Sequence, residues 1–392
     1  MMIFARHSVL KRGCSTWDPQ QMPKAEFQAR LDRTRREMAQ LDLDALAIYG
    51  DNYSFADICY LTNYFPKVRG GLALVPREGA LTLLLNIGSR DVPFAKTLTW
   101  VDDVRASQQL GADGAKLLKD RGLENARLGW VDSGRGFPLP QLDEMKQGLP
   151  QATWESVDTM FQPARLYKSP REIAAMNAAG RLLNEICRGA AAFIKSGRKE
   201  FEVIADIDRL ARNLGAEDIR ILAGTQRLNP PSFKQTAQLT SHWAVYLAVQ
   251  HERYWAEAGR TYILADASGK VQSVYRRAQA TLAAMVKQLK PHRPTADIED
   301  VARRELGEFY PTAAVYGLAN GIGLNLWEAP FLDQDDAHQV GAFLVGSERF
   351  DENMTLALRV VIEAAGNIVI SGDSFHLTTA GAHSLMGMSA NG

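Results

Sequence analysis

Apolar and polar residues form two kinds of pattern along the N-terminal half of the chain. Between 24 and 41, apolar side chains such as Phe27 and Leu31 recur near helical spacing among charged residues, which predicts an amphipathic helix. Short apolar runs ended by turn residues predict buried strands, and a second helix follows later. The strand runs are 45–50, 71–76, 80–86 and 127–132, and the second helix is expected near 111–120. This alternation predicts an α/β domain over residues 1–162.

The C-terminal half begins with a strong helix start. Ser169 is a suitable N-cap, Pro170 suits the first helical position, and Glu172 stands where a capping box needs an acid. Further helical periodicity is found at 196–216, 271–289 and 296–309. Two helix pairs, each followed by strands, predict a second domain over residues 163–392.

Residues 243–266 predict two adjacent strands joined by a bend. The apolar, aromatic-rich runs 245–249 and 260–264 flank a polar segment, His251 to Gly259, and such runs favour a pleated sheet. Glu257 lies just before the second run, and Arg260 is the first residue of that run. They are either part of a site or a surface ion pair of little energetic weight.

Composition narrows the function classes. A chain of 392 residues is long enough for two domains, and its 45 basic and 45 acidic residues leave no net charge to attract nucleic acid or an anionic membrane. No apolar run approaches the length of a membrane span, and the first residues make a poor signal peptide. Three widely spaced cysteines imply no disulfide framework, so cytoplasmic residence is expected.

Several segments resemble the pita-bread family, which includes creatinase, prolidase and methionine aminopeptidase. They are the entry helix at Ser169, the paired strands with Glu257-Ala258-Gly259-Arg260-Thr261, the glycine-rich segment around Asn320, and the last strands at 354–381. The resemblance implies an α/β (α+β) protein: a creatinase-like N-terminal domain, then a pita-bread domain with a duplicated helix pair and a curved antiparallel sheet.

The same resemblance implies a homodimer in which the N-terminal domain lies near the partner's active site. Tyr64, Phe65 and Arg69 stand at matching places and would contribute to substrate binding there. The alternative is that the two aromatic side chains serve packing and that Arg69 is a solvated charge.

The metal ligands of the family are largely replaced in this chain. Metallopeptidases of the family hold two divalent ions with two aspartates, a histidine and two glutamates, which offset the charge of the ions. The resemblance assigns these five positions to Tyr246, Glu257, Asn320, Glu363 and Gly372. Two carboxylates cannot hold two ions, so we expect no catalytic metal and no other cofactor. One weakly held ion on Glu257, Glu363 and Asp373 is the alternative.

Creatinase offers a precedent, because it has this fold without the metals and cleaves a C–N bond with a histidine. No histidine occupies the corresponding segment around Asn229 here. We therefore expect Glu257 and Glu363 to face each other and share acid and base roles. His376 is a third catalytic candidate because it lies near the Gly372 position, with His242 and His251 as weaker ones.

The remaining site residues would bind substrate. Tyr246 and Asn320 can donate hydrogen bonds to an oxyanion, and Arg260 can hold a carboxylate or simply brace the strands. Trp327 would line the cavity unless it only serves packing.

Together these features predict a metal-independent, creatinase-like hydrolase that cleaves a C–N bond of a small polar molecule. A lyase acting by proton abstraction and a non-catalytic binding protein remain open, because one scaffold supports varied functions.

Overall fold

The computed structural model describes residues 16–66, 69–131, 137–158, 160–234, 236–265, 267–331 and 348–387. The chain forms two compact units that divide between Arg165 and Leu166. The sequence analysis predicts this boundary slightly earlier, at residue 162. Each unit is described by itself. No helix of the described residues is both long and apolar enough to cross a membrane.

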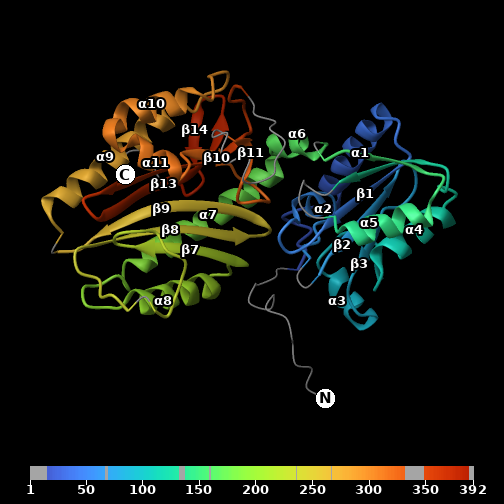
Figure 1. The fold of residues 1–392 in the computed structure, drawn as a ribbon, viewed down its shortest axis with the longest axis horizontal. Helices are drawn as coiled ribbons and strands as arrows, with labels where there is room; N and C mark the ends of the chain where they lie inside the picture. Colours follow the sequence, from blue (N-terminus) through green and yellow to red (C-terminus); the bar gives the residue numbers. More distant parts are fainter. Residues whose placement is uncertain are drawn as a thin grey trace, which may run out of the picture. The chain divides into compact units, whose positions relative to one another are not determined.

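The N-terminal unit is built on a mixed sheet (blue and cyan in Figure 1) with the strand order β4-β3-β2-β1-β5-β6 in its described part. Strands β1, β2 and β3 pair antiparallel, whereas β4, β5 and β6 join in parallel. Leucines of α4 and α5 pack with the alternate residues of β1 and β2. The elements are α1 Lys24–Gln40, β1 Ala45–Gly50, α2 Ala56–Thr62, β2 Gly71–Pro76, β3 Thr82–Leu85, η2 Ser89–Asp91, α3 Val92–Lys96, β4 Asp103–Ala106, α4 Leu110–Asp120, β5 Arg127–Val131, α5 Leu139–Gly148, β6 Thr153–Ser156 and α6 Phe161–Leu166.

The C-terminal unit is built on a largely antiparallel sheet (yellow to red in Figure 1). Its strand order over the described residues is β11-β10-β12-β13-β9-β8-β7, and β14 pairs with β13. The elements are α7 Pro170–Ala190, α8 Glu200–Asn213, β7 Asp218–Gly224, β8 His242–His251, β9 Tyr254–Ile263, α9 Gly269–Val286, α10 Asp297–Leu306, η3 Gly307–Phe309, α11 Tyr310–Val315, β10 Ala319–Gly321, β11 Glu328–Phe331, β12 Thr355–Ala364, β13 Asn367–Thr378 and β14 Gly381–Ser384.

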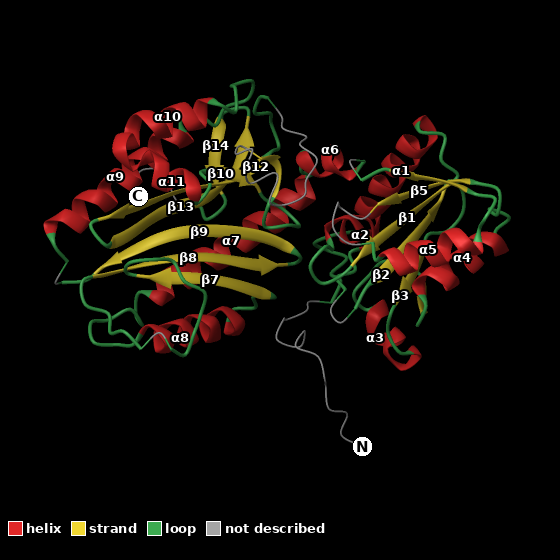
Figure 2. Ribbon diagram, viewed as in Figure 1, coloured by secondary structure: helices red, strands yellow, loops and turns green. Residues whose placement is uncertain are grey.

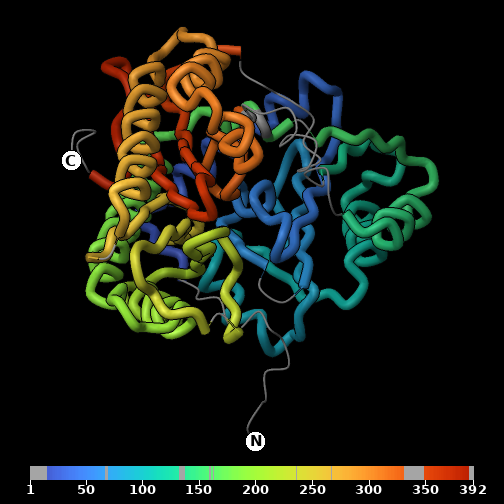
Figure 3. The backbone as a smooth tube through the Cα atoms, turned by 60° about the vertical axis from the view of Figure 1, so that its left-hand side comes forward, coloured from blue at the N-terminus to red at the C-terminus, as the bar shows by residue number. Residues whose placement is uncertain are grey.

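The duplicated helix pair that the family resemblance implies is confirmed. Helices α7 and α8 share one apolar core with strands β7, β8 and β9, and helices α9 and α10 share another with β12 and β13. Figure 2 shows β7, β8 and β9 side by side with α8 against them, and the two helix pairs can be followed by colour in Figure 3. The capping box also forms, because Ser169 Oγ accepts from the Glu172 N–H and Glu172 accepts from the Ser169 N–H.

The bend between β8 and β9 is much shorter than the sequence analysis predicts. Only Glu252 and Arg253 lie outside the strands, and both have positive φ angles, 47° and 71°, as a two-residue hairpin turn requires. The segment interpreted as polar bend therefore extends both strands. As a result, Glu257 lies inside β9 rather than before it.

Candidate functional site

The strands of the C-terminal unit have an outer face, on which the helices pack, and an inner face. On β8, Trp243, Val245, Leu247 and Val249 point outward into the core with α7 and α8, so Tyr246 points inward. The strand registers place five residues in one row across the sheet. This central row consists of Leu222, Tyr246, Gly259, Gly372 and Arg359.

A buried polar cluster lies where the central row meets Glu257. Arg359 Nη1 donates to Glu257 Oε1 at 2.8 Å and to Asn320 Oδ1 at 2.8 Å, and the Tyr246 hydroxyl donates to Glu257 Oε2 at 2.8 Å. Glu257 is only 2% exposed, Arg359 5% and Asn320 1%, so these bonds are shielded from water. Low local dielectric strengthens each of them.

The backbone around the cluster fixes its geometry. Ser374 Oγ accepts from the Glu257 N–H and donates to the Glu257 carbonyl, both at 2.9 Å, which clamps β9 to β13 at this residue. Arg359 Nε donates to the Tyr316 carbonyl at 3.0 Å, and the guanidinium lies 5.6 Å from the ring centroid of Trp327. The guanidinium is therefore held in one orientation.

Tyr246 is a neutral hydrogen-bond donor in this setting. Burial raises the pKa of its phenol well above the ordinary value, and the neighbouring Glu257 carboxylate raises it further, although Arg359 opposes both effects. The hydroxyl therefore keeps its proton at physiological pH and can donate either to Glu257 or to an oxygen of a bound molecule.

The donor set of this cluster does not fit a two-ion metal centre. A phenol, a carboxylate, an amide, a guanidinium and a glycine converge there, and the guanidinium already bonds two of the expected ligand positions. A fixed positive charge at hydrogen-bond distance from Glu257 and Asn320 opposes binding of a divalent cation. No group of three or more His, Cys, Asp and Glu side chains suited to a metal ion occurs in the described part of the chain.

Arg359 is the site residue that the sequence analysis missed. It lies directly opposite Gly372 in the β12–β13 register, four residues before Glu363. A detectable signal exists, because an arginine in the middle of the buried apolar run of β12 is rarely placed there without a partner. Its partner could not be named from the sequence.

The expectation that Glu257 and Glu363 face each other is wrong. Glu363 is exposed near the end of β12 and accepts a hydrogen bond from the Tyr316 hydroxyl, whereas Glu257 is bonded to Arg359. The strand rise places Glu363 roughly 13 Å beyond Arg359 along β12. Burial and the Glu363 contact raise the pKa of Tyr316 to about 12. Tyr316 therefore connects the two places, with its carbonyl on Arg359 and its hydroxyl on Glu363.

Arg260 does not lie in the site either, which corrects its predicted contact with substrate. It alternates with Glu257 and Gly259 along β9, so its side chain points to the outer face. There it donates to the carbonyls of Gly259 and Gly372 and contacts Met386 Sδ. The alternative interpretation, that Arg260 braces the strands, describes this arrangement.

The three histidine candidates lie apart from the cluster. His376 Nε2 is 3.4 Å from Asn353 Oδ1, and burial together with neighbouring His383 lowers its pKa. His242 is fully buried, with Nε2 3.1 Å from the Ile368 carbonyl. His251 ends β8. The structure brings none of them to Glu257 among the contacts of the described residues, and a catalytic role for His376 stays a prediction.

The predicted substrate-binding residues of the N-terminal unit are mostly packed inside it. Tyr64 and Phe65 are buried, and the Phe65 ring meets the Phe55 ring edge-on with centroids 4.4 Å apart. Arg69 is exposed and donates to Asn86 Oδ1 at 3.1 Å. The aromatic pair therefore serves packing in this unit, and a further role in a partner's site remains a prediction.

Comparison with known proteins relates both units to known families. Residues 174–378 match the model of metallopeptidase family M24, and residues 30–167 match the creatinase/prolidase N-terminal domain. An Xaa-Pro dipeptidase of Pyrococcus horikoshii is 24% identical over 51% of this chain, which spans 59% of that relative's length. An uncharacterized hydrolase/peptidase of Sinorhizobium fredii is 25% identical over 93% of this chain and 95% of its own.

Solved structures agree on the fold. The prolidase from Pyrococcus horikoshii superimposes with a TM-score of 0.74 at 19% identity, covering 92% of this chain and 99% of that one. The X-Pro aminopeptidase from Thermotoga maritima gives 0.76 at 17% identity, covering 92% and 98%. The predicted pita-bread fold with a creatinase-like N-terminal domain is thereby confirmed, and the chain belongs to the M24 family of peptidase-like hydrolases.

Proposed function

We propose that this chain is a creatinase-like hydrolase that cleaves a C–N bond of a small polar molecule without the metal centre of its relatives. One observation carries the proposal: the guanidinium of Arg359 is bonded to both Glu257 and Asn320, at the point where the family's ligand positions converge. A fixed cation thus stands among the positions that the family resemblance assigns to metal ligands.

A guanidinium supplies part of what metal ions supply. Metal ions in such hydrolases polarise the carbonyl and generate hydroxide from bound water. Arg359 can stabilise a developing oxyanion electrostatically, and Tyr246 can donate a hydrogen bond to the same oxygen. Since Arg359 cannot generate hydroxide as a metal ion does, a base must take the proton from the attacking water.

Glu257 is the base in this proposal. It accepts the proton of water as the new C–O bond forms, and it returns that proton to the leaving nitrogen as the C–N bond breaks. Asn320 and Trp327 orient Arg359, the former by its Oδ1 acceptor and the latter by its ring. In this mechanism Glu363 contacts the substrate away from the reacting bond. Arg260 has no role in it.

Metal content is the first test. Protein prepared without added metal is analysed for transition metals and then treated with a chelator. We expect well under one ion per chain, and unchanged activity after chelation. A stoichiometric, tightly held ion would overturn the metal-independent proposal while leaving the hydrolase family intact.

Activity is tested with a panel of small C–N substrates that includes Xaa-Pro dipeptides, N-acyl amino acids and amidino acids. The Xaa-Pro dipeptides are included because relatives carry that substrate in their names. Incorporation of ¹⁸O from labelled water into product separates hydrolysis from a lyase reaction. Turnover that persists in the Glu257→Gln variant would remove Glu257 as base, and no turnover of any panel member would favour a non-catalytic binding protein.

Assembly as a homodimer and cytoplasmic residence complete the proposal. The family resemblance supports the first, and the few widely spaced cysteines support the second. Light scattering coupled to gel filtration tests the dimer, and cell fractionation tests the location. A monomer at micromolar concentration would contradict the first expectation.

A further inference from the structure

A second arginine, Arg220, stands at the open end of the inner face. It belongs to β7, the edge strand of the sheet, and alternates with the outward-facing Ile219 and Ile221. Its side chain is 48% exposed, in contrast to that of Arg359 at 5%. Arg220 therefore offers a solvent-accessible guanidinium on the same face as the buried cluster.

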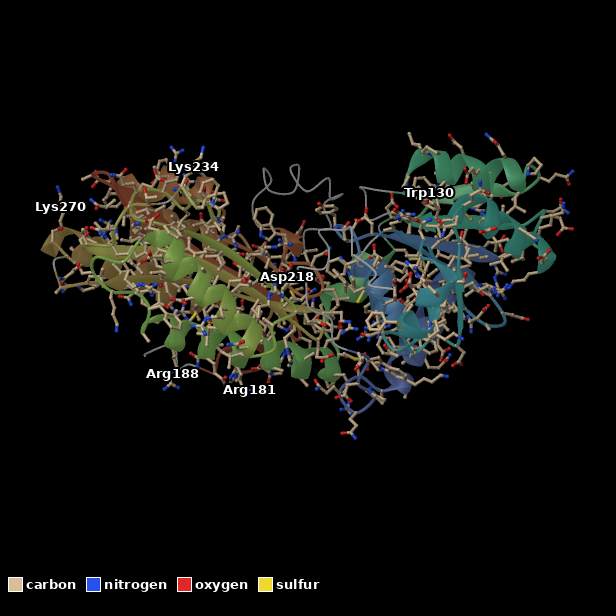
Figure 4. All side chains as sticks on the ribbon, turned by 90° about the horizontal axis from the view of Figure 1, so that it is seen from below. Trp130, Arg181, Arg188, Asp218, Lys234 and Lys270 are labelled. Atoms are coloured by element: carbon tan, nitrogen blue, oxygen red, sulfur yellow. The ribbon has the colours of Figure 1, made fainter. Side chains whose placement is uncertain are left out.

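The Arg220 guanidinium is held in place before any ligand arrives. Its Nη2 lies 3.3 Å from Asp218 Oδ2, and its Cζ lies 5.7 Å from the ring centroid of Trp255 on β9. Asp218, labelled in Figure 4, also faces Arg212 at 3.7 Å, so one buried carboxylate is shared between two cations. Positive charge is left over at Arg220, and its pre-set orientation lowers the entropy cost of binding an anion.

The strand register places Arg220 close to the proposed reacting groups. Arg220 is opposite Ala248, and Ala248 is opposite Glu257, so only an alanine separates the two side chains across the sheet. Two strand spacings correspond to about 10 Å between their Cα atoms. Tyr246 responds to the same charge: burial raises the pKa of its phenol most, and Arg220 is among the groups that oppose the rise.

There is room for a small molecule beside Arg220. A groove of about 610 Å³ runs along the edge strand β7, between helix α8 and residues 230–233. Its lining includes Arg220 and Leu222, together with the outward-facing Ile219 and Ile221 and four residues of α8. Leu222 is the exposed member of the central row and lies opposite Tyr246. Most of the lining is apolar, and Arg220, Asp208 and Ser232 supply its polar groups, a mixture that is typical of small-molecule sites.

We propose that Arg220 anchors a carboxylate of the substrate, about 10 Å or less from Glu257. The substrate class of the proposed hydrolase is then a small carboxylic acid whose C–N bond lies within a few bonds of the acid group, with an apolar part against Leu222. This inference rests on the proposed function for the identity of the reacting bond. The anchor itself is a binding site and can be tested without turnover.

Binding is measured with N-acetylglycine, its uncharged analogue N-acetylglycinamide and inorganic phosphate, by calorimetry and by tryptophan fluorescence. Trp255 lies under the guanidinium, so its emission should change on binding, and Trp255→Phe identifies that signal. We expect N-acetylglycine to bind the wild-type protein about tenfold more tightly than the Arg220→Gln variant, because a charge-assisted pair is lost. N-acetylglycinamide should show no such difference.

A matched control is available on α10. Arg303 also lies over an aromatic ring, 4.2 Å from the Tyr310 centroid, and pairs with Glu299 Oε1 at 2.6 Å. Arg303→Gln makes the same change of net charge away from the inner face and should leave N-acetylglycine binding unchanged. An Arg220→Lys variant should keep part of the affinity.

The other outcomes separate the failure of the anchor from the failure of the proposed hydrolase. Equal binding of N-acetylglycine to wild type and Arg220→Gln, or no binding to either, removes Arg220 as a carboxylate site. Binding of phosphate alone through Arg220 would replace the carboxylate by a phosphate. Carboxylate binding through Arg220 without turnover of any C–N substrate would leave the anchor standing and contradict the hydrolase instead.

Discussion

The two faces of strands β8 and β9 use the same backbone for different purposes. On β8, the outer face carries Trp243 and three aliphatic residues, all fully buried against helices α7 and α8. The inner face carries Tyr246 and Glu257; Glu257 accepts hydrogen bonds from both Tyr246 and Arg359. The outer face is determined by volume and hydrophobicity, whereas the inner face is determined by specific charges and donors.

The difference has an energetic consequence. Each outer side chain contributes roughly 1.5–3 kcal/mol through burial of apolar surface. A buried ion pair contributes little net stability, because desolvation of both charges offsets their attraction. The Glu257–Arg359 pair is thus poorly explained as a stabilising device, which supports a functional reason for it.

The largest effect on stability is expected on the outer face. Trp243→Ala removes a fully buried side chain from the core shared with α7 and α8. We expect a loss of about 4 kcal/mol in the free energy of unfolding, from lost transfer energy and a residual cavity. Urea unfolding measures it. A loss below about 1 kcal/mol would mean that this face is not a tightly packed core.

A slightly smaller loss is expected on the inner face, with a different signature. Arg359→Met leaves Glu257 buried without its cation, and we expect a loss of about 3 kcal/mol, moderated by the remaining bond from Tyr246. The double variant Arg359→Met/Glu257→Gln removes both charges and should recover most of that loss. If the double variant is no more stable than the single one, the inner face is determined by packing like the outer face.

The outer face could be predicted from the sequence because it depends on periodicity. Apolar spacing and the Ser169–Glu172 capping box define α7 well, and the boundaries of α1 and β1 agree with the apolar runs within about one residue. These signals are local in the chain. They indicate which side chains are buried, and this pattern of burial predicts the helices and strands.

The inner face could be predicted only in part. The family resemblance identifies Tyr246, Glu257 and Asn320, and the structure brings these three together. Arg359 and Glu363 share one face of β12, and only the register with β13 decides which of them meets Glu257. Pairing across distant strands is not encoded in local spacing. Arg260 is likewise placed by strand geometry, because β9 begins at Tyr254 and its alternation turns Arg260 to the outer face.

A pH effect separates the two faces further. His242 lies on the inner face, fully buried, and burial lowers its pKa below the ordinary 6.5 while hydrogen bonds to backbone carbonyls oppose this. The unfolded chain then binds a proton more readily than the folded one. Stability from this residue is fully present above about pH 6.5 and is lost as the pH falls towards the lowered value.

Replacement of His242 by glutamine should flatten this dependence. Glutamine can still donate to the Ile368 carbonyl but does not titrate. Urea unfolding at about pH 7.5 and about pH 5.5 should show a larger loss in wild type than in His242→Gln. Equal losses would contradict a buried, neutral His242. A control variant is His383→Gln, which makes the same substitution at another histidine, in β14.

The smallest effect on stability is expected at the rim of the inner face. Arg220 is half exposed and its contacts with Asp218 and Trp255 are open to water, so Arg220→Gln should change the free energy of unfolding by less than about 0.5 kcal/mol. The same substitution is expected to weaken carboxylate binding strongly. A residue whose loss affects binding but not stability belongs to a site, whereas a loss of stability above about 1 kcal/mol would make Arg220 a structural brace for β7. The proposed site would then consist of the buried cluster alone, and the group that binds the substrate carboxylate would have to be another residue.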